Sequence, residues 1–184
     1  MKKIMIDLDD VICNDGWLEL VNTFLKANYT YKDVEGFYIN ELVPKELEMD
    51  FINWYETQQQ YDYATLKDGV LNVIEKLNNN YEIYICSAFV FPYKPEISGE
   101  ILKQKFNYLQ TILPFLDRNK FIFCNNKAII NCEIKIDDSM KNLNNAETKI
   151  LFTAYHNKNI ETELLSKENI IRANNWFEIE SILL

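Results

Sequence analysis

The chain has 184 residues, and 48% of them are hydrophobic, which is enough for one main domain with a proper core. Its 19 basic and 28 acidic residues give a net charge of −9, which argues against a nucleic-acid polymer as partner. The sequence has no apolar run long enough for a membrane span, and the run behind Met1-Lys2-Lys3 stops at Asp7, too early for a signal peptide. We therefore expect a cytoplasmic protein, monomer or homodimer, that acts on a small molecule.

The first segment, "KKIMIDLDDV", predicts a buried strand that ends in acids. Its apolar residues stop at the point where Asp7, Asp9 and Asp10 fall within four positions. Like charges at the end of a buried strand repel one another, so this cluster needs a chemical explanation.

Residues 15–66 predict a helical insertion after that strand. Apolar residues recur at helical spacing in residues 17–25 and again in residues 47–55. Within the insertion, Trp54 and Tyr55 are candidates to stack on a flat ligand, with help from Trp17 or Phe37, although aromatics at helical spacing more often form core. We predict a small helical cap over a core that comprises residues 1–14 and 67–184.

From residue 68 onward, helices and strands alternate. A short amphipathic helix over residues 70–77 precedes the strand "YEIYICSA", and a helix over residues 98–113 precedes the strand "KFIFC". Two further strands, "CEIKIDD" and "TKILFT", are joined by a short helical link. This alternation predicts an α/β fold with a Rossmann-like, largely parallel sheet flanked by helices, whose functional groups gather at the carboxyl ends of the strands.

Those strand ends carry polar residues that we take as the candidate site: Asp7 and Asp9 on the first strand, Ser87 on the second, Lys127 after the third, and Asp137 and Asp138 on the fourth. Converging carboxylates require a compensating cation, and Mg²⁺ with oxygen ligands is the simplest one. A lysine and a hydroxyl beside such an ion suit a phosphate group. Taken singly, Ser87 fits a helix N-cap and Lys127 a solvated surface lysine, whereas a carboxylate pair directly after a buried strand costs desolvation unless it binds something.

The order of these residues resembles the motifs of a known superfamily. "DLDDV" resembles the DxDx[TV] motif of the haloacid dehalogenase superfamily, and Ser87, Lys127 and Asp137-Asp138 match its second, third and fourth motifs in order. Within that superfamily, "DGVLNVIEKLNNNYEIYICSA", "FIFCNNK", "IKIDDS", "ILFTAYHN" and "RANNWFEI" resemble the 5′(3′)-deoxyribonucleotidase family, including its bacterial members, over nearly the whole core. The cap matches more loosely, and Asp10 and Asn125 depart from the common pattern.

The resemblance implies a Mg²⁺-dependent phosphatase that hydrolyses the phosphate monoester of (deoxy)ribonucleoside monophosphates. Asp7 would be the nucleophile that forms an aspartyl-phosphate, and Asp9 the general acid and base, with a pKa raised by its acidic neighbours. Ser87 and Lys127 would bind the transferring phosphoryl group. The ligands implied for Mg²⁺ are Asp7, the Asp9 carbonyl, and Asp137 and Asp138, one directly and the other through water.

Two alternatives keep part of this chemistry. The cap decides which substrate enters, so the enzyme could act on another small phosphorylated metabolite. A phospho-accepting receiver-like signalling module also combines acids, a hydroxyl and a lysine on a parallel sheet, but the long insertion after the first strand counts against it. Near the end of the chain, His156 matches a family motif that could simply shape a loop, and we expect Arg172 and Trp176 to be structural.

Overall fold

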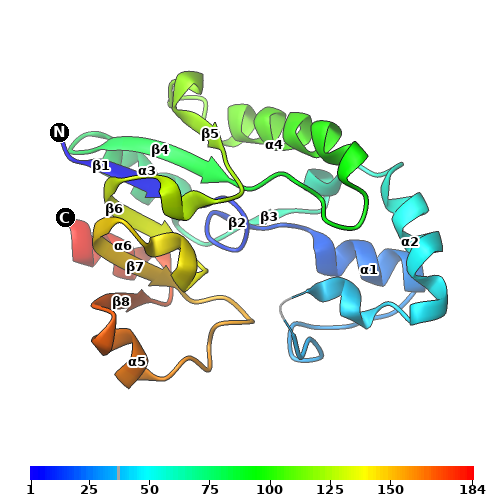
Figure 1. Ribbon diagram of the computed structural model, residues 1–184. Helices are drawn as coiled ribbons and strands as arrows, with labels where there is room; N and C mark the ends of the chain where they lie inside the picture. Colours follow the sequence, from blue (N-terminus) through cyan, green and yellow to red (C-terminus); the bar gives the residue numbers. More distant parts are fainter. Residues whose placement is uncertain (37) are drawn as a thin grey trace.

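The computed structural model describes residues 1–36 and 38–184, so Phe37 lies outside the described residues. In these ranges a six-stranded sheet has the order β5-β4-β1-β6-β7-β8, and all neighbouring pairs are parallel (Figure 1). Its strands are β1 (Lys3–Ile6), β4 (Glu82–Ser87), β5 (Phe121–Phe123), β6 (Cys132–Asp137), β7 (Ala146–Phe152) and β8 (Ile170–Ala173). The predicted α/β fold with a parallel sheet is confirmed, and its central strands β1 and β6 carry the acidic motifs.

Helices and short 3₁₀ turns connect these strands. The core contains α3 (Val70–Asn78), α4 (Ser98–Ile112), α5 (Thr162–Lys167) and α6 (Trp176–Leu183), with η4 (Pro95–Ile97), η5 (Arg118–Lys120), η6 (Lys127–Ile129) and η7 (Met140–Leu143). α3 and α6 lie side by side behind the sheet (Figure 1). The helices predicted over 70–77 and 98–113 are confirmed, whereas β8, α5 and α6 were not predicted.

One face of the sheet is the apolar core. Successive residues of a strand point to opposite faces, so Ile134 and Ile136 of β6 pack into the main hydrophobic cluster with α3 and α6. Lys135, between them, points to the other face, as does Asp137. In the described part of the chain, no helix is both apolar enough and long enough to cross a membrane.

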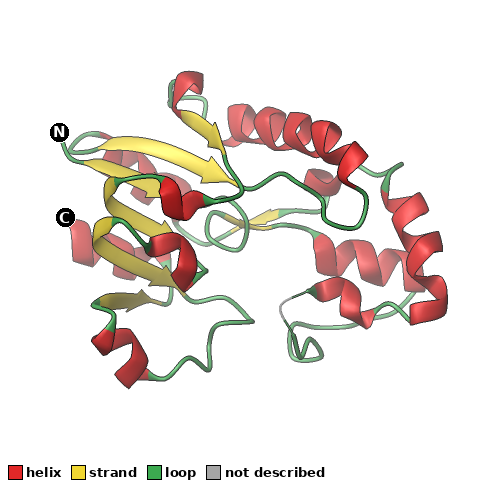
Figure 2. Ribbon diagram, viewed as in Figure 1, coloured by secondary structure: helices red, strands yellow, loops and turns green. Residues whose placement is uncertain are grey.

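The insertion leaves and re-enters the core through a two-stranded antiparallel ribbon, β2 (Cys13–Asn14) and β3 (Thr65–Leu66) (Figure 2). It contains α1 (Trp17–Leu25), η1 (Ile39–Leu42), η2 (Lys45–Leu47), α2 (Glu48–Tyr55) and η3 (Gln60–Asp62). Both predicted helices are present, and they share a second hydrophobic cluster. Gly16, near the start of the insertion, has a φ of 78°, and a Cβ there would lie 2.8 Å from the carbonyl oxygen of Gln60, near its end. Because a side chain would clash at this distance, the close approach of the two ends requires a glycine. We propose residues 15–66 as the cap and the rest as the core.

Candidate active site

The carboxyl ends of the strands open into a cavity of about 310 Å³ between the core and the insertion. Asp7, Asp9, Lys127 and Asp138 line it from the core side. Ser87 and Asp137 lie just behind this lining, and both are fully buried. The residues expected from the sequence are thus brought to one place, in two layers.

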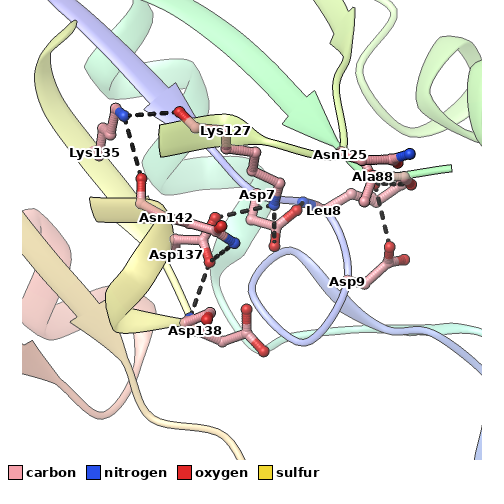
Figure 3. Close-up of polar contacts among 12 residues, drawn as sticks. Asp7, Leu8, Asp9, Ala88, Asn125, Lys127, Lys135, Asp137, Asp138 and Asn142 are labelled. Atoms are coloured by element: carbon pink, nitrogen blue, oxygen red, sulfur yellow. Dashed lines mark hydrogen bonds and ion pairs between the residues drawn. The ribbon is translucent and has the colours of Figure 1, made fainter. Parts of the chain in front are cut away.

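Lys127 links the first and fourth motifs directly. Its Nζ lies 2.6 Å from Asp7 Oδ2 and 2.9 Å from Asp137 Oδ2 (Figure 3). Burial raises the pKa of Asp7 well above its usual value, Lys127 opposes this rise, and the charges of Asp137 and Asp138 add to it. Lys127 itself is buried, which lowers its pKa, but the two carboxylates outweigh burial and hold that pKa above its usual value. The lysine is therefore a fixed positive charge beside the expected nucleophile.

The three acids form a site that a metal ion would fit. One carboxylate oxygen from each of Asp7, Asp137 and Asp138 lies within 4.8 Å of the others, and all three residues are buried. Oxygen-only ligands of this kind suit a hard divalent cation. Burial, followed by the charge of Asp138, raises the pKa of Asp137, although Lys127 and Asn142 oppose the rise. A bound cation would relieve this repulsion, so the acids form a candidate metal centre.

The surroundings of Asp9 differ from the sequence-based expectation. Lys105 on α4 places its Nζ 2.5 Å from Asp9 Oδ2, and the Tyr61 hydroxyl donates to Asp9 Oδ1 over 2.5 Å. Burial raises the pKa of Asp9, but the charge and hydrogen bond of Lys105, together with the Tyr61 hydrogen bond, outweigh burial and lower it. The prediction that acidic neighbours raise the pKa of Asp9 is therefore wrong, because a lysine far away in the sequence lies beside it.

Lys105 also reaches the second motif. Its Nζ donates to Ser87 Oγ at 2.8 Å and to the Ala88 carbonyl at 2.5 Å. Sequence reasoning missed this residue, although a signal was present. Lys105 is four residues after Ile101 and four before Leu109, so it interrupts the buried stripe of α4. A charged residue on the buried face of a helix requires a partner, and here the partners are Asp9 and Ser87.

Asn125, one of the departures from the family pattern, fastens the loop that follows β4. Its Oδ1 accepts hydrogen bonds from the backbone N–H groups of Phe89 and Val90 at 2.9 and 3.1 Å. Both of these loop residues line the cavity. The Asn125 side chain therefore holds the loop after Ser87 in place.

Asp138 and Asp10 lie close to His156, with one side-chain oxygen or nitrogen of each residue within 4.8 Å of the others. His156 Nε2 lies 2.6 Å from Asp138 Oδ2, so His156 contacts a motif residue and does more than shape a loop. Asp10 is buried and has a φ of 58°, a left-handed conformation that Asp tolerates better than most residues. Burial raises its pKa well above the usual value, and the charges of Asp15 and Asp138 add to the rise.

The aromatic candidates of the insertion separate into two groups. Trp17 and Tyr55 line the cavity and stack on each other, with ring centroids 4.7 Å apart. Tyr55 is largely buried, and its hydroxyl donates to Gln60 Oε1 at 2.7 Å. Trp54 is not among the residues that line the cavity; it packs on Phe24, with centroids 5.5 Å apart, in the cluster that holds the insertion together. Of the named pair, only Tyr55 is placed to meet a ligand.

The two residues expected to be structural have structural contacts. The Arg172 guanidinium donates to the carbonyls of Asn157 and Ile160 at 3.2 and 3.3 Å. Trp176 is fully buried, and its Nε1 donates to the Val11 carbonyl at 2.9 Å. Through Val11, the last helix therefore supports the loop that carries the first motif.

Comparison with known proteins agrees with this geometry. The family described as "5' nucleotidase, deoxy (Pyrimidine), cytosolic type C protein" matches residues 1–184. The chain is 31% identical over 194 residues to a 5′(3′)-deoxyribonucleotidase of Bacillus subtilis, covering 100% of both proteins, and 27% identical over 180 residues to one of Clostridium acetobutylicum, covering 96% of this chain and 92% of that protein.

Solved structures agree on the fold. A haloacid dehalogenase-like protein of Agrobacterium tumefaciens superposes with a TM-score of 0.57 at 11% identity, covering 99% of this chain and 97% of that one. A hydrolase of the same superfamily from Bacillus subtilis, bound to magnesium, gives a TM-score of 0.55 at 15% identity, covering 99% of this chain and 98% of that one. Together with the full-length sequence match, these findings show that the chain belongs to the 5′(3′)-deoxyribonucleotidase family and is a nucleotide phosphomonoesterase.

Proposed function

We propose that the protein hydrolyses deoxyribonucleoside monophosphates in a Mg²⁺-dependent reaction through an aspartyl-phosphate on Asp7. The observation that supports this most strongly is the pairing of Lys127 with both Asp7 and Asp137 at 2.6 and 2.9 Å, beside a cavity that the insertion covers. A nucleophilic carboxylate, a fixed positive charge and an oxygen-lined metal centre together suit phosphoryl transfer.

In the first step, an Asp7 carboxylate oxygen attacks phosphorus, and the bond from phosphorus to the sugar oxygen breaks. Asp9 lies two residues further along the same segment and would deliver a proton to that oxygen. In the second step, Asp9 accepts a proton from the water that attacks the aspartyl-phosphate, which releases inorganic phosphate and restores Asp7. Lys105 lowers the pKa of Asp9 and so favours the carboxylate form that the second step needs.

Mg²⁺ would be held by Asp7, the Asp9 carbonyl and Asp138, and when bound it supplies positive charge to the phosphoryl oxygens. Asp137 accepts protein hydrogen bonds at both of its oxygens, from Lys127 at Oδ2 and from Ser139 N–H and Asn142 Nδ2 at Oδ1. Asp138 would therefore hold the ion directly, and Asp137 would contact it through water. The magnesium-bound structure of the Bacillus subtilis hydrolase supports the choice of ion.

Substrate contacts would come from both sides of the cavity. Lys127 would steady the phosphoryl oxygens, and Trp17 and Tyr55 present aromatic rings that suit a nucleobase. Ser87 lies behind this lining and would support the phosphate end of the site through its contacts with Asp9 and Lys105. The family description, which names deoxy and pyrimidine compounds, supports a preference for deoxyribonucleotides such as dUMP and dTMP.

The test is release of inorganic phosphate from dUMP, dTMP, UMP and a set of sugar phosphates, with and without Mg²⁺. We expect the deoxynucleotides to give the highest kcat/KM and chelation to abolish turnover. Preference for a sugar phosphate would indicate a different metabolite as substrate. A stable phospho-aspartate without turnover would indicate a receiver-like module and would refute the proposal.

A further inference from the structure

Lys135 is a charged residue inside the sheet. It occupies the middle of β6, between Ile134 and Ile136, and its side chain is fully buried. The two isoleucines point into the apolar core, so the lysine points to the opposite face, the one to which Asp137 also points. A buried ammonium group is unfavourable unless each of its three N–H donors is paired.

Three backbone carbonyls pair those donors. Lys135 Nζ donates to the carbonyl oxygens of Lys127 at 3.0 Å, Asn142 at 3.2 Å and Asn144 at 2.6 Å, and Figure 3 shows the first two of these contacts. Among the described residues, no carboxylate forms a salt bridge with Lys135. The ammonium group therefore binds main chain rather than an acid.

The main chain that it binds belongs to two turns of the active site. Lys127 begins η6 and Asn142 lies in η7, and these two turns lie against each other over Lys135. The same two residues hold Asp137 with their side chains, Lys127 at Oδ2 and Asn142 at Oδ1, over 2.9 and 3.0 Å. Each residue thus contacts Lys135 through its backbone and Asp137 through its side chain.

We propose that Lys135 is a positioning residue, which sets the geometry of the cation- and phosphate-binding end of the site by clamping η6 against η7. The inference rests on the proposed phosphatase function, because it concerns the same site. Without the ammonium group, three carbonyls lose their donor, and the two turns are free to separate. Lys127 would then move relative to Asp7, and Asn142 relative to Asp137.

The test replaces Lys135 by Met, which keeps an unbranched apolar side chain and removes the three donors. Lys149→Met is the matched control, because Lys149 pairs with Lys135 in the register of β6 and β7 and its Nζ has a single carbonyl contact, with Glu168 at 3.4 Å. Titration calorimetry would measure the dissociation constants of Mg²⁺ alone and of inorganic phosphate in the presence of Mg²⁺, and kinetics would give kcat and KM.

We expect both dissociation constants to rise about tenfold in Lys135→Met and to stay at the wild-type values in Lys149→Met. A tenfold rise is at the lower end of the loss of affinity that follows when a residue supporting the metal ligands is removed. If Lys135→Met has the wild-type far-UV spectrum but unchanged dissociation constants, the lysine serves stability alone and the inference is overturned. If that variant does not fold, Lys135→Gln takes its place. Glutamine keeps a polar end but is shorter, uncharged and has one donor fewer, so unchanged constants in that variant overturn the inference equally.

These binding measurements separate the inference from the proposed function. A wild-type protein that binds Mg²⁺ and phosphate but releases no phosphate from nucleotides would refute the function. The effect of Lys135→Met on the two dissociation constants would then still decide the inference.

Discussion

Replacing Lys105 by Met tests the assignment of Asp9 most directly. The substitution keeps most of the apolar stem on α4 and removes the ammonium group that contacts Asp9 Oδ2 at 2.5 Å and Ser87 Oγ at 2.8 Å. A charge-assisted hydrogen bond contributes about 2 kcal/mol, and the loss of that amount from the transition state lowers kcat roughly thirtyfold. The Tyr61 hydrogen bond to Oδ1 remains, so residual activity is expected.

Lys105→Met should also change stability and the pH profile. Removing one partner of a buried ion pair lowers the free energy of unfolding by about 3 kcal/mol, and the figure is at the low end because the Asp9 side chain is 26% exposed. Burial raises the pKa of Asp9 and Lys105 counteracts burial, so the pKa rises when the lysine is lost. The limb of the pH profile on which Asp9 must be ionised should therefore move to higher pH.

The assay is phosphate release from dUMP across pH, together with urea unfolding. Lys103→Met is the control, because Lys103 lies on the same helix and forms an exposed pair with Glu100 at 3.2 Å. This control should retain the wild-type kcat, pH profile and unfolding midpoint. A folded Lys105→Met variant with wild-type kcat and an unshifted pH limb would refute the link between Lys105 and Asp9.

Four further substitutions address the remaining assignments. Asp7→Asn removes the nucleophilic charge, so phosphate release should fall to the uncatalysed level, and retained turnover would exclude Asp7 as nucleophile. Tyr61→Phe removes the hydroxyl that lies 2.5 Å from Asp9 Oδ1. Loss of about 1.4 kcal/mol of transition-state stabilisation should lower kcat about tenfold, and KM should stay unchanged in steady-state kinetics. Trp17→Ala should raise KM because Trp17 lines the cavity, whereas Trp54→Ala should lower the free energy of unfolding by about 3 kcal/mol and leave KM unchanged. The opposite pattern in kinetics and urea unfolding would exchange the roles of these two tryptophans.

The part of the site that lies at strand ends could be predicted from the sequence. Parallel strands place their carboxyl ends at one edge of the sheet. Asp7 and Asp137 each lie at the carboxyl end of a strand, so they are expected at the same edge. The same local patterns located β1, β4 and β6. The strand β8 was missed because it is a short edge strand, and Ile171 is 43% exposed, so its sequence lacks the continuous apolar run of a central strand.

The contacts of Lys105, Tyr61 and Lys135 could not be predicted in this way. Lys105 is 96 positions from Asp9, and Tyr61 is 52 positions from it, so no local pattern connects these residues. Lys135 lies within "EIKID", where one lysine in a buried strand marks an unusual position but does not identify the carbonyls that pair with it. A lysine on an apolar helix face or in a buried strand indicates that a partner exists, and only the fold identifies the partner.

The buried charged residues of the site determine how it could bind an anionic substrate. Within the described residues, the buried charged side chains are four aspartates and three lysines, namely Asp7, Asp10, Asp137, Asp138, Lys105, Lys127 and Lys135. Lys127 is shared by two of these acids, and Lys135 contacts only carbonyls, so neither lysine compensates Asp138. Asp138 has His156 at 2.6 Å, and Asp10 lies close to both. Among the described residues, neither Asp138 nor Asp10 forms a salt bridge with a lysine. Ionised carboxylates at these two positions would repel a phosphate dianion, and we therefore propose that the acids make a bound divalent cation a condition for substrate binding as well as for catalysis.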